Sequence, residues 1–412
     1  MFVQTDGARV DRAQAVRLRG LSADDAGLVD SSSGIDVAQR TLARCRDDDP
    51  VMSPSEPLPD LDAKLHYLRS GSAHEAAGTA VEAIETHMSW VFLAGDRVLK
   101  LKKPVRYDFL DFSTLQAREF YCREELRLNA RLAPGVYLDV LALQWHDGTF
   151  ALLPPQRLPA PGQTVDWLVL MRRLPARHML DQRIASGDVT PEDIGALCVV
   201  LVDFYGHAPS VAVEPKEYVQ RLHREQRTNR KVLLDPRWPL PGSVSALDRL
   251  EAALCEHALE LQSRAAQGRV LDGHGDLRPE HVCLLRPPVV IDCLEFNAAL
   301  RQVDPLDEIA YLGLECELAG APWIAAQLFE GCASALVDGR SSPALLHLYT
   351  AQRALLRARL ALAHLLDPSP RTPDRWPVRA RRYIERATTA LDALDVLDAG
   401  GALQVEPPPH SP

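Results

Sequence analysis

The residues best suited to chemistry cluster in one segment of the second half of the chain. Asp276 lies in the turn His274-Gly275-Asp276, and Asp292 follows the short apolar run Val289–Ile291. Phosphoryl transfer needs two carboxylates of this kind. One orients the attacking hydroxyl and takes its proton, and the other holds the metal ion that neutralises the phosphate oxygens. The segment therefore suits phosphoryl-transfer chemistry.

Histidine and cysteine side chains in the same segment offer a different interpretation, a zinc site. The candidate ligands are His274, His281, Cys283 and Cys293. Zinc sites are recognised by regular spacings of such residues, and this set matches no zinc-finger spacing. The zinc interpretation therefore ranks below phosphoryl transfer.

The elements that must position these carboxylates begin with a strand-rich stretch over residues 83–171. A hairpin is expected from Ser89–Leu93 and Val98–Lys102 around Gly95. Further strands are expected over 136–144, 149–153 and 165–171. Ser113–Gln116 fits a capping box that opens a helix ending near Pro134. Before this stretch, residues 61–82 carry an apolar stripe and then a helix expected from Ser72.

From Leu174 onward, helical signals dominate. Thr190 followed by Pro191 marks a helix start. Further helices are expected over 216–233, 243–266 and from Leu306 to about Leu397, with short β-prone runs at 282–285 and 289–291. We therefore predict a bilobal α+β fold, with a β-rich N-lobe over 61–171, a helical C-lobe over 172–397 and a ligand cleft between them. Residues 1–60 are expected to form a mobile extension and 398–412 a disordered tail.

The motifs resemble those of the aminoglycoside phosphotransferase family, a branch of the protein-kinase-like fold. A closer resemblance is to the kinase part of bifunctional aminoglycoside phosphotransferase/ATP-binding proteins. The shared segments are Ser89–Leu93, Val98–Pro104, Phe109–Ser113, Cys122–Asn129, His274–Leu277 and Ile291–Asn297. The resemblance covers roughly residues 75–395. It implies ATP and Mg²⁺ as cofactors and a hydroxylated small molecule as substrate, with Asp276 as the catalytic carboxylate and Asp292 as the metal ligand.

Such a site also needs a lysine on the α- and β-phosphates and a glutamate that holds this lysine. Lys100 and Lys102 share with Val98 a strand face that otherwise points inward, where lysine is rare unless it is paired. Lys100 is the first choice and Lys102 the second. Glu125 is favoured over Glu124 as the partner, because it shares a helix face with the apolar positions three and seven residues on.

The catalytic loop departs from the kinase pattern at His281, where that pattern has an asparagine as second metal ligand. An imidazole can bind a divalent cation, but Mg²⁺ prefers oxygen. His281 therefore either ligates the metal, hydrogen-bonds Asp292 or lies outside the metal shell. His274 is expected to pack and hydrogen-bond beneath the loop.

The nucleotide-binding parts also depart from the kinase pattern. The loop Glu85–Ser89 has no glycine, and no Walker motif occurs in the chain. Ser89 and neighbouring backbone N–H groups are expected to contact phosphate. Met171 and Arg173 lie at the expected interlobe hinge, whose backbone would bind adenine. These departures leave two alternatives open, a nucleotide-binding pseudokinase with a regulatory role and a transferase that moves AMP instead of phosphate.

A polar cluster follows the metal aspartate and predicts the substrate pocket. Its candidate residues are Glu295, Asn297, Asp304 and Asp307. Acidic side chains there would suit an amine-bearing or polyhydroxylated acceptor, such as an aminoglycoside, a sugar or a nucleoside. The alternative for this cluster is a capping-rich loop before the helix that starts near Pro305.

Composition restricts the partners and the location. The net charge of -10 argues against a nucleic-acid binder, which usually carries a basic stripe. None of the eight cysteines forms a CxxC pair, which indicates reduced thiols. No apolar run approaches the ~18 residues of a membrane span, and the first 20 residues lack the pattern of a secretory signal. We therefore expect a cytoplasmic protein that binds neither nucleic acid nor membrane, in an oligomeric state that the sequence leaves open.

Overall fold

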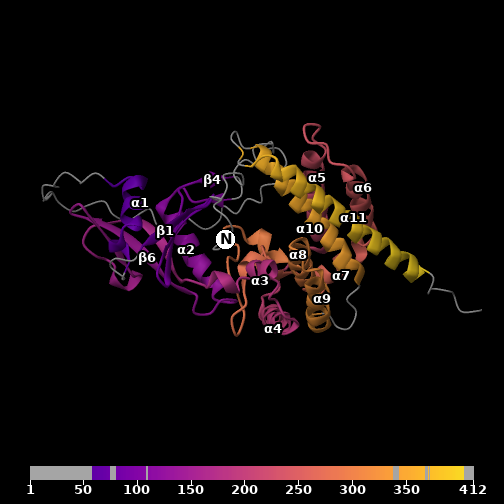
Figure 1. Ribbon diagram of the computed structural model, residues 1–412, viewed down its shortest axis with the longest axis horizontal. Coiled ribbons are helices and arrows are strands. Elements are labelled where there is room, and N and C mark those ends of the chain that lie inside the picture. Colours follow the sequence, from indigo (N-terminus) through magenta and orange to yellow (C-terminus); the bar gives the residue numbers. More distant parts are fainter. Residues whose placement is uncertain are drawn as a thin grey trace, which may run out of the picture.

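The computed structural model describes residues 58–74, 80–107, 110–336, 343–366, 370 and 372–402. Within these ranges the chain forms a sheet-containing lobe and a helical lobe, which lie side by side in Figure 1. The expected mobile extension (apart from its last three residues), most of the expected tail and the shared residue Phe109 lie outside the described residues.

The N-lobe is built on an antiparallel sheet with the strand order β1-β2-β3-β8-β6-β7. Its strands are β1 (Val81–Glu85), β2 (Ser89–Ala94), β3 (Arg97–Lys102), β6 (Tyr137–His146), β7 (Thr149–Leu153) and β8 (Gln163–Arg172). A small ladder of β4 (Arg106–Tyr107) and β5 (Leu110–Asp111) leads from β3 into the helix α2 (Leu115–Asn129). The hairpin, the helix and the three later strands are confirmed, with shifts of a few residues at their ends.

The segment before the sheet differs from the prediction. Helix α1 (Leu61–Arg69) is followed by one 3₁₀ turn, and β1 begins at Val81, where the pattern favours a helix from Ser72. Val81 and Ala83 pack against the apolar cluster that contains Leu65 and Leu68. Alternate residues of this five-residue strand therefore supply a sheet face, a period-two signal too short to stand out in the sequence.

Helix α2 begins one residue later than its expected capping box. Thr114 is the cap, and its side chain accepts a hydrogen bond from the N–H of Ala117 at 3.1 Å. Ser113 instead bonds to Asp111. The helix packs on β8 and β6 and points Glu125 into the protein, where the side chain is fully buried.

The C-lobe consists of helices that pack mainly around α10. They are α3 (Leu180–Ser186), α4 (Pro191–His207), α5 (Pro215–Leu233), α6 (Ser243–Glu256), α7 (Ala258–Ala266), α8 (Pro305–Leu318), α9 (Pro322–Leu336), α10 (Pro343–Ala363) and α11 (Arg375–Ala402). Thr190 and Asp193 form the capping box that starts α4. The helix expected over 243–266 is divided at His257, and α11 extends beyond Leu397. Among the described residues, no helix has the length and apolar composition needed to cross a bilayer.

Two short antiparallel ladders fix the segment that carries the aspartates. Strand β9 (Leu271–Asp272) pairs with β12 (Gln302–Val303), and β10 (Val282–Cys283) pairs with β11 (Val289–Val290). Asp276 therefore lies four residues beyond the end of β9, and Asp292 lies two residues beyond the end of β11. The predicted α+β fold of two lobes is confirmed, and these ladders hold the aspartates where the lobes meet.

Candidate active site

Two lysines and a glutamate form a buried cluster at the edge of the N-lobe. Lys100 Nζ lies 2.6 Å from Glu125 Oε1 and 3.2 Å from Asp292 Oδ1. Lys102 Nζ lies 2.6 Å from Glu125 Oε2 and also contacts Glu295. Because the two lysines are two residues apart on β3, the pleat turns both toward the same helix. One carboxylate therefore holds two ammonium groups in place.

Geometry separates the roles of the two lysines. Lys102 has a fully buried side chain, and its ammonium group lies 4.9 Å from the centre of the Phe112 ring. Lys100 borders a cavity and reaches Asp292, which Lys102 does not. Lys100 is therefore the lysine that faces the cavity, and its contact with phosphate stays a prediction. Glu124 points outward to Arg127, so the choice of Glu125 over Glu124 matches the structure.

The charges in this cluster stabilise one another. Burial acts to lower the pKa of Lys100, but the carboxylates of Asp292 and Glu125 outweigh burial and hold its pKa well above the ordinary value. Burial acts to raise the pKa of Asp292, but Lys100 outweighs it and holds that pKa well below the usual range. Both groups are therefore charged near neutral pH.

Asp292 occupies an unusual backbone conformation. Its φ of 63° lies in the left-handed region, which non-glycine residues seldom adopt. Its N–H donates to the hydroxyl of Tyr137 at 3.1 Å, and the next N–H, that of Cys293, donates to Asn129 Oδ1 at 2.9 Å. These two bonds join the loop after β11 to the N-lobe and aim the Asp292 carboxylate at Lys100.

The loop that carries Asp276 is held by a buried carboxylate, Glu308 of α8. Glu308 accepts hydrogen bonds from the backbone N–H groups of His274 and Gly275, and from the hydroxyl of Tyr205 at 2.8 Å. A Cβ at position 273 would lie 2.7 Å from Glu308 Oε2, so only glycine allows this approach. Gly275 has a φ of 86°, which turns the loop toward Asp276.

His274 supports the loop from beneath, as the sequence predicts. The imidazole is fully buried, and its Nε2 lies 2.9 Å from the carbonyl oxygen of Ile291. Its Nδ1 accepts a hydrogen bond from the N–H of Asp276 at 3.2 Å. The ring therefore links the two aspartate-bearing segments through backbone groups and lies behind the reacting atoms.

The Asp276 carboxylate is held by one hydroxyl and one guanidinium. Tyr311 donates to Oδ1 at 3.2 Å, and Arg278 Nη2 lies 3.0 Å from Oδ2. Burial acts to raise the pKa of Asp276, but Arg278 outweighs it, so the pKa falls below the ordinary value. Asp276 is therefore ionised near neutral pH and can accept a proton.

His281 lies between the two aspartates. Its Nδ1 lies 2.8 Å from the carbonyl oxygen of Asp276, and its Nε2 lies 3.6 Å from Asp292 Oδ2. Arg278 Nη2 approaches the same Nε2 at 3.3 Å. Since Nδ1 donates to a carbonyl, Nε2 is the acceptor for Arg278. The imidazole is thus tied to the backbone of the Asp276 loop through Nδ1. Its other nitrogen, Nε2, is the one a metal ion would have to bind, and it is already in contact with the Arg278 guanidinium.

A pH-dependent stability follows from this burial. Desolvation lowers the pKa of His281 from 6.5 to about 4, so the folded protein takes up this proton less readily than the unfolded chain. The free energy of unfolding therefore carries no cost from His281 above pH 6.5, and it decreases as the pH falls from 6.5 toward 4, because the unfolded chain then binds the proton first. Between pH 7 and pH 5, the free energy of unfolding should fall by about 2 kcal/mol more in the wild type than in His281→Asn.

The measurement for His281 is urea unfolding of both proteins at several pH values with a chelator present. The difference between them isolates one imidazole, because every other titrating group is shared. Equal pH slopes in the two proteins would mean that His281 takes up its proton as readily in the folded protein as in the unfolded chain, contrary to its burial.

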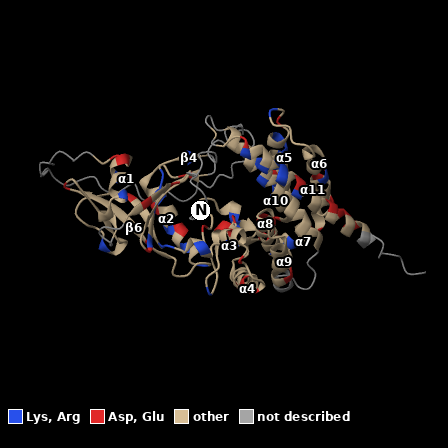
Figure 2. Cartoon of the chain, viewed as in Figure 1, with Lys and Arg blue, Asp and Glu red and all other residues tan. Residues whose placement is uncertain are grey.

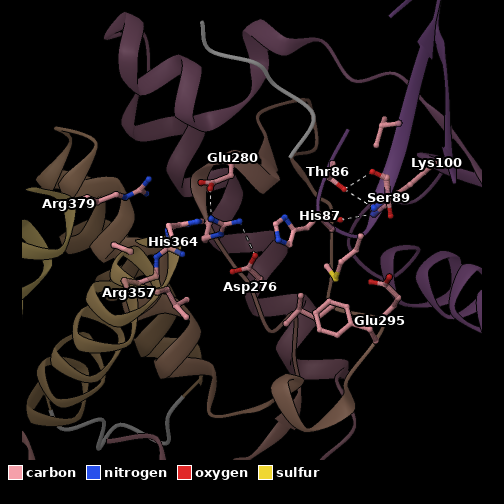
Figure 3. Close-up of a pocket in the computed structure, with 18 of the residues that line it drawn as sticks. Thr86, His87, Ser89, Lys100, Asp276, Glu280, Glu295, Arg357, His364 and Arg379 are labelled. Carbon is pink, nitrogen blue, oxygen red and sulfur yellow. Dashed lines mark hydrogen bonds and ion pairs between the residues drawn. The ribbon is translucent and has the colours of Figure 1, made fainter. Parts of the chain in front are cut away.

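A cavity of about 290 Å³ opens between the lobes, and of the residues described above it is lined by Lys100, Asp276, Arg278 and Asp292, together with Glu295. It runs from the turn Thr86–Ser89 past Lys100, Asp292 and Asp276 to side chains of α10 and α11. Figure 3 shows Ser89 and Lys100 on one side of the cavity, with Asp276 between them and the residues Arg357 and Arg379. The cavity thus has a lysine end and an arginine end, and Asp276 lies between the two.

The turn Thr86–Ser89 lines the cavity at the end where Lys100 lies. It contains no glycine, and hydrogen bonds of the Thr86 hydroxyl hold it together. Thr86 Oγ1 accepts from the N–H of Ser89 at 2.9 Å and donates to the carbonyl oxygen of Ser89 at 2.9 Å. Ser89 lines the cavity, but its N–H is already used in this turn. A phosphate contact from Ser89 therefore depends on its hydroxyl and stays a prediction.

The predicted hinge residues lie apart from this cavity. The Met171 side chain is buried in the N-lobe core, and the N–H of Arg173 donates to the carbonyl oxygen of Asp96 at 2.7 Å. Neither residue lines the cavity. Their contact with adenine therefore remains a prediction.

The predicted substrate cluster is largely corrected. Asp304 is fully buried, caps α8 and pairs with Arg264, whereas both oxygens of Asp307 are bound by Arg353 at 2.7 and 2.6 Å. Asn297 caps the turn Ala298–Arg301. These three residues do not line the cavity, and the alternative of a capping-rich loop describes them better. Glu295 does line it, but as a partner of Lys102.

Several residues of this site were missed in the sequence. They are Glu308, Tyr311, Tyr137, Asn129 and Arg278. Arg278 directly follows the segment His274–Leu277, so its position beside the Asp276 motif could have indicated a role. Glu308 is a carboxylate within the apolar run of α8, which indicates a buried charge with partners. Tyr137 and Asn129 act through contacts between distant segments that no local pattern shows.

The arrangement of potential ligand side chains bears on which metal this site could hold. Within the described ranges, no group of three or more histidine, cysteine, aspartate or glutamate residues could hold a metal ion. His274 is engaged with Ile291, so the zinc interpretation is not supported. Mg²⁺ needs fewer protein ligands, because it is usually held by one or two carboxylates together with phosphate oxygens and water. The Asp292 carboxylate, partly exposed to the cavity, fits that requirement.

Comparison with known proteins gives relatives of unassigned activity. No family model matches the chain. Proteins of Mycobacterium bovis and Mycobacterium tuberculosis, each named only as an uncharacterized protein, are 29% identical over 323 residues. The aligned region is 76% of this chain and 61% of those proteins, so the chain matches less than two thirds of their length.

Solved structures with some similarity are small-molecule kinases and phosphotransferases. A choline/ethanolamine kinase family protein from Mesorhizobium loti is 17% identical, with a TM-score of 0.47 over 81% of this chain and 99% of its own. The ADP-bound aminoglycoside phosphotransferase APH(2'')-Ib is 11% identical, with a TM-score of 0.43 over 81% and 99%. A choline kinase from Cryptosporidium parvum is 10% identical, with a TM-score of 0.48 over 78% and 92%.

Proposed function

We propose that this protein transfers the γ-phosphoryl group of ATP to a hydroxyl of a small molecule. The observation that carries the proposal is the position of Lys100, 2.6 Å from Glu125 and 3.2 Å from Asp292. These residues come from β3, α2 and the loop after β11 and meet at one end of the interlobe cavity. A lysine paired with a helix glutamate and facing a metal-binding aspartate is the arrangement by which protein kinases transfer phosphate from ATP.

Each side chain has a defined task in the proposed reaction. Lys100 binds phosphate oxygens, and Glu125 holds its ammonium group in position. Asp292 provides the carboxylate for Mg²⁺, which when bound would neutralise charge on the phosphates. His281 is proposed to position the loop, since its Nε2 already accepts from Arg278 at 3.3 Å.

Asp276 would orient the acceptor hydroxyl and take its proton. In that step the acceptor oxygen bonds to the γ-phosphorus, the bond from this phosphorus to the bridging oxygen breaks, and ADP leaves. Tyr311 and Arg278 hold the Asp276 carboxylate ready, at 3.2 and 3.0 Å. The low pKa of Asp276 means that it starts the reaction ionised and accepts the proton late, as a weak base does.

The role of Lys100 can be tested by replacing it with methionine. The variant should have a kcat/KM for ATP about 10–100-fold lower, because a charge-assisted contact is worth about 1.5–3 kcal/mol. Lys103→Met is the matched control, since Lys103 pairs with Glu85 at 2.6 Å and does not line the cavity. Equal effects of the two substitutions would contradict the assignment.

Product analysis of the wild type separates the proposed reaction from its alternatives. With ATP, Mg²⁺ and a panel of alcohols, phosphoryl transfer yields ADP and an acceptor heavier by one phosphate. AMP transfer would instead yield pyrophosphate and an AMP-bearing acceptor. Tight nucleotide binding without either product would favour the pseudokinase, and this result would overturn the proposal.

A further inference from the structure

The end of the cavity farthest from Lys100 is lined by arginine side chains. Arg357 of α10 and Arg379 of α11 both line it, together with Trp376 and Tyr383. In Figure 3 these two arginines extend from the helices of the C-lobe on the side of Asp276 opposite Lys100. Figure 2 shows Lys and Arg gathered where α10 lies beside α5 and α11. An acceptor bound next to Asp276 would therefore meet guanidinium groups.

The two arginines from α10 and α11 have only one carboxylate within ion-pair distance among the described residues. Glu315 is the carboxylate between the two arginines, 2.7 Å from Arg357 Nε and 3.8 Å from Arg379 Nη2. One carboxylate therefore faces two guanidinium groups. The third arginine of the cavity, Arg278, is balanced separately by Asp276 at 3.0 Å and Glu280 at 2.6 Å. The pair from α10 and α11 thus shares one carboxylate, whereas Arg278 alone is paired with two.

Each of the two arginines has guanidinium N–H groups that do not point at Glu315, the carboxylate they share. The hydrogen bonds that Arg357 makes within the described residues leave from Nε, to Glu315 and to the hydroxyl of Tyr383 at 3.3 Å. Arg379 bonds through Nη2 to the same hydroxyl at 3.3 Å, and its side chain is 35% exposed. Guanidinium groups bind carboxylate or phosphate in a two-pronged geometry, so this pair can hold an anion.

Of the three carboxylates expected to attract an amine, Glu295 lines the cavity but is paired with Lys102, and the other two do not line it. Asp304 and Asp307 are engaged with Arg264 and Arg353 elsewhere in the C-lobe. Glu280 lines the cavity, but its carboxylate is bound by Arg278. Besides the arginines, this end offers a flat wall, because His364 and Trp376 stack with ring centres 3.7 Å apart. The surroundings therefore favour an anionic acceptor over a cationic one.

We propose that the acceptor alcohol carries a carboxylate or phosphate group, which Arg379 and Arg357 bind while its hydroxyl lies at Asp276. The inference rests on the proposed function, because it assigns the substrate class of the same site. It reverses the expectation of an amine-bearing acceptor. The binding group is the same for both anions, so the experiment must distinguish carboxylate from phosphate.

The test compares four hexoses that differ in one substituent: glucose, glucosamine, glucuronate and glucose 6-phosphate. Binding to the full chain is measured by calorimetry, with Mg²⁺ and a non-hydrolysable ATP analogue present. At least one acidic sugar should bind about tenfold more tightly than glucose, since a charge-assisted contact is worth about 1.5–3 kcal/mol. Glucosamine should show no such gain. The tighter of the two acidic sugars identifies the preferred anion.

Arg379→Gln is the diagnostic variant, because its side chain is partly exposed and its loss leaves the Glu315–Arg357 pair intact. It should reduce the affinity for the acidic sugar to that for glucose. Arg381→Gln removes the same charge from an exposed position of α11 that does not line the cavity, and it should retain the preference. Unchanged thermal unfolding of both variants shows that they are folded.

The outcomes separate this inference from the proposed function. Preference for glucose or glucosamine, no binding of either acidic sugar, or equal behaviour of the two variants would overturn the anion site. ADP formation with a neutral or amine-bearing acceptor would do the same and leave the proposed function standing. Binding that depends on Arg379, with no ADP formed from the acidic sugars or from any alcohol of the panel, would support the anion site and contradict the proposed function.

Discussion

Replacing Asp276 with asparagine should lower kcat about 10²–10⁴-fold, the usual contribution of a positioned general base. Asparagine keeps the shape of the side chain and can still accept from Tyr311, which lies 3.2 Å from Oδ1. It cannot take up the hydroxyl proton. The affinity for ATP should change little, because Lys100 and Asp292 supply the expected nucleotide and metal contacts. Steady-state kinetics and calorimetry on the same preparation measure both quantities.

The control for this substitution is Asp96→Asn. Asp96 lies in the turn between β2 and β3, and its side chain is 84% exposed. The control should keep full activity. An Asp276→Asn protein that is folded and retains more than a tenth of the wild-type kcat would remove Asp276 from the chemical step. Such a result would point to a proton acceptor elsewhere in the cavity or to solvent.

Replacing Glu125 with alanine should lower the free energy of unfolding by about 3–5 kcal/mol, the typical cost of breaking a buried ion pair. In the wild type, the ammonium groups of Lys100 and Lys102 each lie 2.6 Å from the Glu125 carboxylate. The substitution removes this shared carboxylate and leaves the two lysines close together. Lys102 is the more affected, because its side chain is fully buried. Nucleotide affinity should fall as well, since Lys100 loses its anchor. Urea unfolding and nucleotide titration measure the two effects.

Glu124→Ala provides a matched control on the same helix. Glu124 makes an i,i+3 pair with Arg127 at the surface, at 2.7 Å, so its loss should cost only about 0.5 kcal/mol. A comparable loss of stability in the two variants would show that Glu125 is not specially buried. A stable Glu125→Ala protein with normal ATP affinity would contradict the assigned role of the lysine–glutamate cluster.

The ion pairs around Glu125 explain how two lysines can lie side by side in the protein interior. Burial alone would neutralise an ammonium group, but Glu125 and Glu295 together hold the pKa of Lys102 above its ordinary value. Lys102 thus serves as a fixed counter-ion behind Glu125. Lys100, bound to the same carboxylate, keeps its other side toward Asp292 and the cavity. The structure thereby separates a fully buried lysine from one that faces the cavity.

Local sequence patterns were sufficient for most of the elements. Thr190 with Asp193 marks the start of α4 through a capping box, and the β2–β3 hairpin follows from β-prone runs around Gly95. Such signals depend on residues a few positions apart. They failed at β1, where the strand face becomes apolar only by packing on α1.

The sequence also indicated much of the lysine end of the site. Lys100, Lys102 and Glu125 were identified by the periodicity of their strand and helix, because a charged residue on an inward face needs a partner. The two aspartates came from a motif. In each case the type of residue and its spacing determined the prediction. The structure brings the lysines, Glu125 and Asp292 into contact, and it places Asp276 on the same cavity.

The arginine end of the site was decided by the tertiary structure alone. In the sequence, Asp304 and Asp307 follow Asp292 closely and suggest an acidic pocket, whereas Arg357 and Arg379 lie far along the chain in unremarkable helices. Folding buries the first pair against Arg264 and Arg353 and brings the second pair beside Asp276. Which charged groups a site can offer to a ligand depends on which of them are already engaged in ion pairs within the protein. Which groups are paired across distant segments is determined only by three-dimensional packing.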